Sequence, residues 1–240
     1  SAQIIPWNFP FEMSSRSLSA ALTTGNACVV KTAENDPITQ YWFAKAAEYA
    51  GFPPGAVNIL CGLGKEAGAA LSSHPDVNQI VFTGSVATGS AIASAAAKNI
   101  VPCTLELGGK SAAIVYDDAD IDNLIDSIRW GIFYNAGQVC SAMSRVIVPQ
   151  KLHDEISERA GELAKSLSVG PGSERTKFGL NMGSMISELQ RDRAINLCQK
   201  AQTEGATTVT GGHKLNRPGW FLEPTVFSNV KPDMEIAQVE

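Results

Sequence analysis

The first hundred residues alternate short runs of β-forming residues with longer stretches rich in alanine. This alternation is the feature that most restricts the fold, because strands separated by helices are typical of a parallel sheet with helices on its faces. We expect strands at 27–31, 57–61, 79–83 and 102–106. The sequence therefore predicts a Rossmann-like α/β fold for this part of the chain.

Three helices are expected among these strands. The first begins at Pro37 and ends before Gly51, which is followed by two prolines, as is usual beyond a helix C-terminus. The other two are expected at 64–72 and 89–98. Together they complete a strand–helix alternation typical of nucleotide-binding folds.

The pattern changes after Gly108-Gly109, and we place a domain boundary there. A strand is expected at 111–116, followed by helices at 121–133, 152–167 and 187–204. The helix at 152–167 has one apolar stripe at helical spacing. The sequence thus predicts two domains, 1–108 and 109–240, of which the second is also α/β.

Composition excludes several classes of partner. The chain is 44% hydrophobic and 18% charged, which is ordinary for a globular protein with a core. Its net charge of −5 argues against nucleic acid or an anionic membrane, because both require a basic face. No apolar run reaches the roughly 20 residues of a membrane helix. The three histidines have no metal-ligand spacing, so no metal site is expected.

Five cysteines are spread along the chain without a Cys-x-x-Cys pair. This spacing fits a reducing compartment rather than a disulfide framework. We expect a cytoplasmic location, although an organellar matrix is equally reducing. Four of the cysteines are expected to be small buried hydrophobic residues: Cys28, Cys61, Cys103 and Cys198.

Cys140 differs from the other four because it follows Gly137 and Gln138 in a loop. A flexible glycine lets a thiol face a cavity, and a thiolate attacks carbonyl carbon atoms. The resulting thioester requires a base that activates water, and Glu106, in the run 105–110 (Leu-Glu-Leu-Gly-Gly-Lys), is a candidate. Asn8, in the run 6–10 (Pro-Trp-Asn-Phe-Pro), reads by itself as a turn residue.

These three runs, in this order and spacing, closely resemble the aldehyde dehydrogenase superfamily, and the resemblance extends from about Ile4 to Glu240. It implies that Cys140 is the nucleophile and forms a thiohemiacetal with an aldehyde. Asn8 would donate a hydrogen bond to the oxyanion, together with the backbone N–H of Cys140. Glu106 would activate the water that hydrolyses the thioester. Relatives that transfer the acyl group to coenzyme A usually lack this glutamate, so a free carboxylic acid is the expected product.

Two glycine loops compete for the pyrophosphate of a dinucleotide. The run 62–68 is a near match to Gly-x-Gly-x-x-Gly with one residue too many, whereas the run 82–89 also follows a strand and precedes a helix. The family uses the second loop. The resemblance therefore assigns Gly84, Ser85 and Gly89 to the cofactor and leaves the first loop as a structural turn.

Further cofactor residues follow from the same resemblance. Lys31 and Glu34 follow a strand end and would hold the adenosine ribose; a carboxylate there favours NAD over NADP. The family commonly has proline at the position of Thr32. Glu240 matches the residue that holds the nicotinamide ribose. The resemblance thus implies a partial NAD-binding domain over 1–108 and a partial catalytic thiol domain over 109–240.

Family members are about twice this length, so we expect the sequence to be an internal fragment of a longer enzyme. The expected reaction is NAD-dependent oxidation of an aldehyde to an acid in a homodimer or homotetramer. Trp130, Phe133, Tyr134 and Met143 suggest an apolar substrate tunnel but do not identify the aldehyde. The alternative is a catalytically silent protein of this fold, either a structural homologue or a fragment that cannot complete its site. A lesser alternative is acyl transfer to coenzyme A.

Overall fold

The computed structural model describes residues 1–173 and 181–240. The chain divides into two compact units, Ser1–Gly108 and Gly109–Glu240. We describe each unit by itself.

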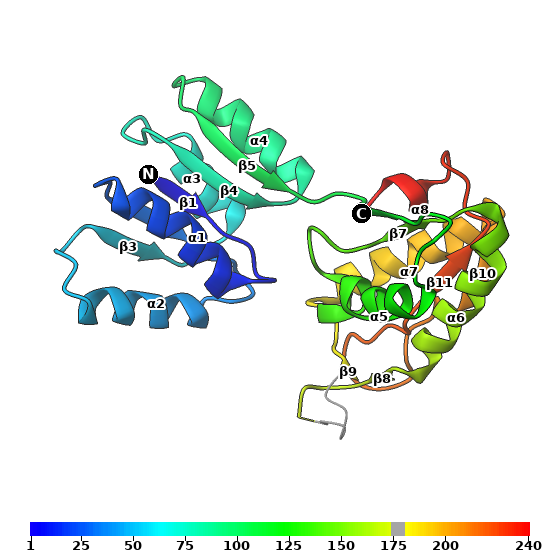
Figure 1. Ribbon diagram of the computed structural model, residues 1–240. Helices are drawn as coiled ribbons and strands as arrows, with labels where there is room; N and C mark the ends of the chain where they lie inside the picture. Colours follow the sequence, from blue (N-terminus) through cyan, green and yellow to red (C-terminus); the bar gives the residue numbers. More distant parts are fainter. Residues whose placement is uncertain (174–180) are drawn as a thin grey trace. The chain divides into compact units, whose positions relative to one another are not determined.

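The first unit is built on a five-stranded parallel sheet, which confirms the expected fold class (Figure 1). The strand order is β3-β2-β1-β4-β5, and every neighbouring pair is parallel. The strands are β1 Ala2–Ile4, β2 Cys28–Lys31, β3 Val57–Leu60, β4 Ile80–Gly84 and β5 Cys103–Leu107. The chain moves outward from β1 on one side and then returns to place β4 on its other side, so the strand order reverses between β1 and β4.

Helices cover both faces of this sheet, because successive side chains of a strand point to opposite faces. Helices α1 (Pro10–Thr23) and α2 (Ile38–Tyr49) pack on one face, over Cys28 and Val30. Helices α3 (Ala69–Ser72) and α4 (Val86–Ala97) pack on the other, over Ile80 and Phe82. The alternation along β2 and β4 therefore divides the core of the unit into two layers.

The first two elements, β1 and α1, were not expected from the sequence. Strand β1 has only three residues, all buried, and is too short to show a period. Helix α1 begins with Pro10 at its first turn and has no side-chain N-cap. β1 nevertheless forms the centre of the sheet, with parallel partners on both sides.

The other elements lie close to their expected ranges. Gly51 has a φ of 77° just beyond α2, a left-handed conformation that favours glycine and ends the helix. The helix expected at 64–72 is instead a π-helical turn, Gly64–Gly68, followed by α3. Helix α4 begins three residues earlier than expected, at Val86, because Ser85 caps it.

A buried polar contact locks α1 onto α2. The side chain of Gln40 on α2 is fully buried. Its amide Nε2 donates to the backbone oxygen of Pro10 at 3.0 Å, and the hydroxyl of Ser14 donates to its Oε1 at 2.9 Å. The first turn of α1, directly after Asn8, is therefore held by a side chain 30 residues away in the sequence.

The second unit combines short two-stranded sheets with longer helices. Its larger core joins α5 (Ile121–Ile132) and α6 (His153–Ser166) through Ile128, Leu163 and Ala164. A smaller core includes Ala201 and Met234. The strand pairs are β6 Ala112–Ile114 with β7 Arg145–Ile147, β8 Ser168–Val169 with β9 Asn181–Met182, and β10 Thr207–Thr210 with β11 Val226–Ser228. The helices are α5 Ile121–Ile132, α6 His153–Ser166, α7 Glu188–Thr203 and α8 Glu235–Gln238.

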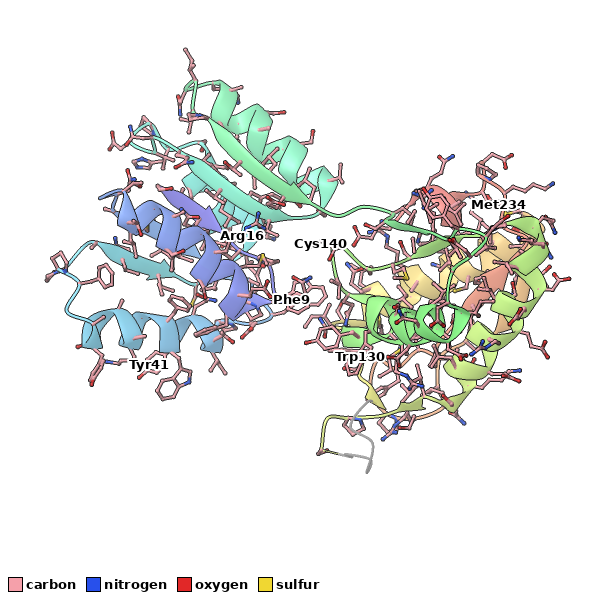
Figure 2. The ribbon with its side chains drawn as sticks, in the orientation of Figure 1. Phe9, Arg16, Tyr41, Trp130, Cys140 and Met234 are labelled. Carbon is pink, nitrogen blue, oxygen red and sulfur yellow. The ribbon has the colours of Figure 1, made fainter. Side chains whose placement is uncertain are left out.

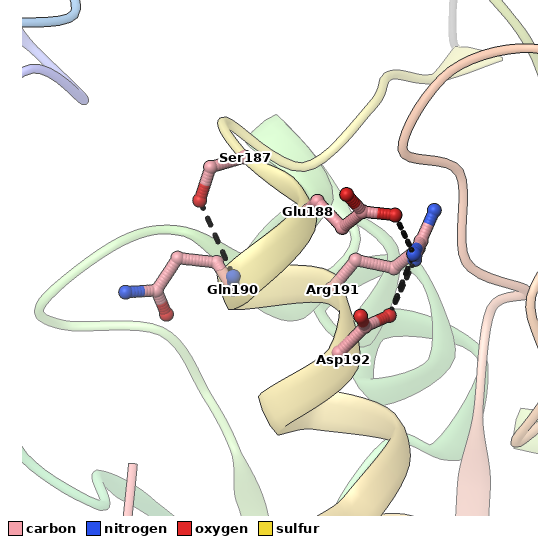
Figure 3. A network of polar contacts seen from close by, with 5 residues as sticks. All are labelled: Ser187, Glu188, Gln190, Arg191 and Asp192. Atoms are coloured by element: carbon pink, nitrogen blue, oxygen red, sulfur yellow. Dashed lines mark hydrogen bonds and ion pairs between the residues drawn. The ribbon is translucent and has the colours of Figure 1, made fainter.

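Helix α7 has the start and end that its sequence predicts. The hydroxyl of Ser187 accepts the backbone N–H of Gln190, and Arg191 is bonded to both Glu188 and Asp192 (Figure 3). Gly205, with a φ of 98°, lies just beyond its C-terminus. Capping and left-handed glycine thus fix both ends of the helix.

Replacing the buried amide should destabilise the first unit. Gln40→Leu removes the donor to Pro10 and the acceptor of Ser14, so we expect the free energy of unfolding to fall by about 1–3 kcal/mol. The measurement is equilibrium urea unfolding. Gln79→Leu is the control, because Gln79 is exposed; equal destabilisation by both changes would contradict the prediction.

Candidate active site

The residues predicted for the first unit gather at one edge of its sheet. In a parallel sheet all carboxyl ends lie at the same edge, and open α/β sheets bind ligands there, at the point where the strand order reverses. Asn8 follows β1, and Glu106 is the second-to-last residue of β5. The remaining residues lie at or beyond the ends of β2 and β4: Lys31, Glu34, Gly84, Ser85 and Gly89.

Glu34 joins the ends of β2 and β3. Its carboxylate forms an ion pair with the buried ammonium of Lys31 at 3.1 Å and accepts the backbone N–H of Gly64. Desolvation raises the pKa of this carboxyl, but hydrogen bonds from backbone N–H groups and the charge of Lys31 outweigh it, so the pKa of Glu34 is lowered. An ionised carboxylate at this edge could accept hydrogen bonds from ribose hydroxyls.

Thr32, where the family commonly has proline, also serves this edge. Its backbone N–H donates to the oxygen of Leu60 at 3.0 Å, a bond that proline cannot form. The ladder between β2 and β3 is therefore extended by one residue, and Lys31 and Glu34 keep their places.

The two glycine loops differ in what holds them. The first loop is tied to Glu34 through Gly64 and continues into the π-helical turn. The second loop enters α4 through Ser85, whose hydroxyl accepts the N–H of Thr88 at 3.3 Å. The other N–H groups at this helix end point toward the edge, where an anion could bind.

Gly89 has a packing role that the sequence did not reveal. It is buried inside the first turns of α4, and a Cβ atom there would lie 2.6 Å from Cδ2 of Leu107. Absence of a side chain lets α4 approach β5 closely. A contact between Gly89 and a cofactor stays a prediction.

Glu106 faces α1 rather than the apolar core. Its neighbours Leu105 and Leu107 pack into the layer with α3 and α4, so the alternation of β5 directs Glu106 to the opposite face. There its Oε1 lies 2.8 Å from Nη2 of Arg16 on α1. Both side chains line a groove of about 320 Å³ between α1, β4 and β5.

Cys140 lies in the second unit, in an irregular loop after α5 (Figure 2). Three successive residues before it have left-handed backbone angles: Asn135, Ala136 and Gly137, with φ of 51°, 55° and 74°. Such conformations are costly for residues other than glycine and persist only where surrounding contacts impose them. The thiol of Cys140 is exposed.

Gln138 supplies several of those contacts. Its Oε1 accepts the backbone N–H of Ile186 at 2.8 Å, and its Nε2 donates to the oxygen of Asn135 at 3.0 Å. The loop is also held at its far end, where the N–H of Met143 donates to Gly131 at 2.8 Å. The cysteine loop is therefore fixed on both sides of Cys140.

One expectation about the other cysteines is wrong. Cys28 and Cys198 are buried and Cys103 is partly buried, and burial raises the pKa of all three thiols. Cys61 is exposed, because it follows the edge strand β3 at the open end of the sheet.

Of the residues suggested for an apolar substrate tunnel, Phe133 is instead a core residue of the second unit, at 4% exposure. Trp130 and Tyr134 are exposed.

Glu240 lies near Lys110 and Arg193 within the second unit. Burial raises the pKa of the Glu240 carboxyl, although the Gly109 N–H and both cations oppose this. Burial also lowers the pKa of Lys110. A carboxylate with these donors around it could accept a hydrogen bond from a sugar hydroxyl, and that role of Glu240 stays a prediction.

Comparisons with known proteins identify the chain. The sequence profile of the Aldehyde dehydrogenase family matches residues 1–240. The chain belongs to the aldehyde dehydrogenase family. It is 46% identical to an aldehyde dehydrogenase of Emericella nidulans over 239 residues, 99% of this chain and 48% of that protein. It is 43% identical to a mitochondrial aldehyde dehydrogenase of Leishmania tarentolae, over 99% of this chain and 47% of that protein.

Solved structures of the family agree with this assignment. The NAD+ complex of an aldehyde dehydrogenase from Bacillus cereus has a TM-score of 0.94 and 43% sequence identity, and covers 98% of this chain and 48% of that chain. The chain thus spans about half the length of the relatives it matches. Among the helices within 1–173 and 181–240, none is long and apolar enough to cross a membrane. Over the same residues, no group of three or more His, Cys, Asp or Glu side chains could hold a metal ion.

Two residues near the predicted site were not expected from the sequence, Gln138 and Arg16. Gln138 stands in the cysteine run, and its place two residues before Cys140 was the available signal. Arg16 had no signal, because its importance depends on a partner 90 residues away.

Removing the Gln138 amide should loosen the cysteine loop. Gln138→Ala leaves the Ile186 N–H without its acceptor, so its hydrogen exchange should accelerate about fivefold, as expected for a bond worth about 1 kcal/mol. Mass spectrometry after deuterium labelling measures this exchange. Gln199→Ala, an exposed change on α7 of the same unit, is the control. Unchanged exchange at Ile186 would show that other contacts hold the loop.

The Glu34 contacts should make stability depend on pH. A carboxyl with a lowered pKa stabilises the folded state above its unfolded pKa of 4.5, and this stabilisation is lost as the pH falls through the lower folded value. Glu34→Gln should therefore lower the melting temperature at pH 7, with a smaller difference from the parent at pH 3.5. Thermal unfolding at both pH values measures this, and a difference that grows in acid would contradict the prediction.

Proposed function

We propose that these 240 residues carry the cofactor site and the thiol of an enzyme that oxidises an aldehyde to a carboxylic acid with NAD. The observation that carries the proposal is the exposed Cys140 in a loop whose unfavourable backbone is held by Gln138. Strain of this kind is common where a side chain must be presented for chemistry. Membership of the aldehyde dehydrogenase family supports the same role.

The proposed reaction begins with attack on the carbonyl carbon. The Cys140 thiolate adds to the aldehyde, and the developing alkoxide accepts hydrogen bonds from the Asn8 side chain and the Cys140 backbone N–H. NAD, when bound, would supply the oxidation by accepting hydride, and Cys140 would then hold the acyl group as a thioester. Water then attacks the thioester carbon while Glu106 takes its proton, the C–S bond breaks, and the thiolate returns.

The cofactor would be held at the carboxyl edge of the first sheet and by Glu240. The N-terminus of α4, with Gly84 and Ser85, would bind the pyrophosphate, and Gly89 lets α4 pack closely. Lys31 and Glu34 would bind the adenosine ribose; the Glu34 carboxylate would repel a 2′-phosphate, which favours NAD over NADP. The NAD+ complex of the Bacillus cereus relative supports this choice.

The domain roles and the setting of the enzyme follow from the same proposal. Residues 1–108 would form the NAD-binding domain and 109–240 the catalytic thiol domain of a homodimer or homotetramer. We propose a cytoplasmic location because the exposed Cys61 and Cys140 suit a reducing compartment. The mitochondrial relative makes the matrix the alternative to test.

NADH formation by the full-length protein tests the reaction. With a panel of aldehydes that includes octanal and betaine aldehyde, Cys140→Ala should abolish NADH formation. Glu106→Gln should leave one rapid turnover and slow the following steady state by about 10²-fold or more, because general bases contribute that much. Stopped-flow absorbance separates the two phases.

Two controls complete this experiment. Iodoacetamide should modify Cys140 faster than Cys61, because both thiols are exposed and only the first is proposed as a nucleophile. Adding coenzyme A should not raise the steady-state rate. If the folded protein makes no NADH and iodoacetamide modifies both cysteines at equal rates, the protein is a silent homologue. If coenzyme A accelerates the reaction, the activity is acyl transfer instead.

A further inference from the structure

An ion pair joins helix α1 to strand β5 at the groove between α1, β4 and β5. Nη2 of Arg16, in the middle of α1, lies 2.8 Å from Oε1 of Glu106 on β5. Their side chains are 61% and 45% exposed. Within the residues that the structure describes, Arg16 is the one ion-pair partner of Glu106, and it contacts one of the two carboxylate oxygens.

The surroundings of this pair are neutral. The groove is lined by α1 residues at helical spacing, among them Met13, Ser17 and Ala20, and by Thr83 and Thr104 from the sheet. Arg16 and Glu106 are the two charged residues of its lining. No neighbouring charge in this lining competes for the carboxylate.

Stability does not explain the pair. Ion pairs between exposed side chains contribute little to stability, because solvent screens them and both side chains lose freedom. Orientation is a stronger consequence. Glu106 is followed within three residues by Gly108 and Gly109, so β5 gives its side chain little support beyond Leu107. The guanidinium fixes Oε1 and leaves Oε2 free to accept a proton.

Helix α1 also ties this base to the proposed oxyanion donor. Asn8 lies just before the helix, whose first turn is held by Gln40, and Arg16 extends from the same helix to Glu106. Helix α1 thereby relates the position of the proposed oxyanion donor to that of the proposed base.

We propose that Arg16 is a positioning residue that orients the Glu106 carboxylate for hydrolysis of the Cys140 thioester, which rests on the function proposed above. The step is water attack on the acyl carbon, with the proton going to Oε2 of Glu106 and the C–S bond breaking. Arg16 does not touch the acyl group. Its loss slows deacylation and leaves formation of the acyl-enzyme unchanged.

The test uses p-nitrophenyl acetate and the full-length protein, because an activated ester acylates a reactive thiol without any cofactor. The burst of p-nitrophenolate reports acylation of Cys140, and decay of the acetylated peptide by mass spectrometry reports hydrolysis. Arg16→Gln should keep the burst rate and slow hydrolysis about tenfold, since misplacement of a catalytic group costs at least that much. Arg16→Lys, which can still reach Oε1, should recover hydrolysis to within about threefold of the parent.

Lys45→Gln is the matched control, because it breaks another exposed ion pair of the first unit, to Glu48 on α2. It should change neither rate. Unchanged hydrolysis in Arg16→Gln, or no recovery in Arg16→Lys, would overturn the proposal. Equal loss of burst and hydrolysis with a lowered melting temperature would also overturn it, by showing a structural role. Absence of a Cys140-dependent burst in the parent protein would instead refute the proposed function, and the positioning role with it.

Discussion

Parallel pairing of β1 with β2 on one side and β4 on the other is the constraint on which the first unit depends. It places a three-residue strand at the centre of the sheet and brings every following loop to one edge. Asn8, Glu34, Ser85 and Glu106 then lie along that edge although nearly 100 residues separate the first from the last. With β1 in another position, the side chain of Arg16 on α1 would not reach Glu106 on β5.

The loops at this edge are held by hydrogen bonds of one kind. A side chain from a distant segment satisfies a backbone group of the loop: Gln40 bonds Pro10, and Glu34 bonds Gly64. In the second unit Gln138 does the same for Ile186 and so holds the backbone before Cys140. Backbone polar groups that leave regular structure require partners. Each partner used here also restricts a residue proposed for chemistry.

A contact of the same kind distinguishes the two glycine loops, whose sequences are similar. In the first loop, the N–H of Gly64 donates to the Glu34 carboxylate, and the chain then continues into a π-helical turn. The second enters a twelve-residue helix with a serine cap, and its dipole favours an anion. The resemblance implies that the second loop binds the pyrophosphate, and the serine-capped helix is a physical reason for that assignment.

The sequence by itself determined the parallel α/β class, most helices and the family, because strand–helix alternation, caps and left-handed glycines are local signals. Cys140, Glu106 and Asn8 were found through motifs of the same local kind. Only the tertiary structure decided that β1 is central, that Cys61 is exposed at the sheet end, and that Phe133 belongs to the core. It alone paired Arg16 with Glu106 and Gln138 with Ile186. These contacts join residues 48 to 90 positions apart, and no local pattern specifies which distant side chain meets which backbone.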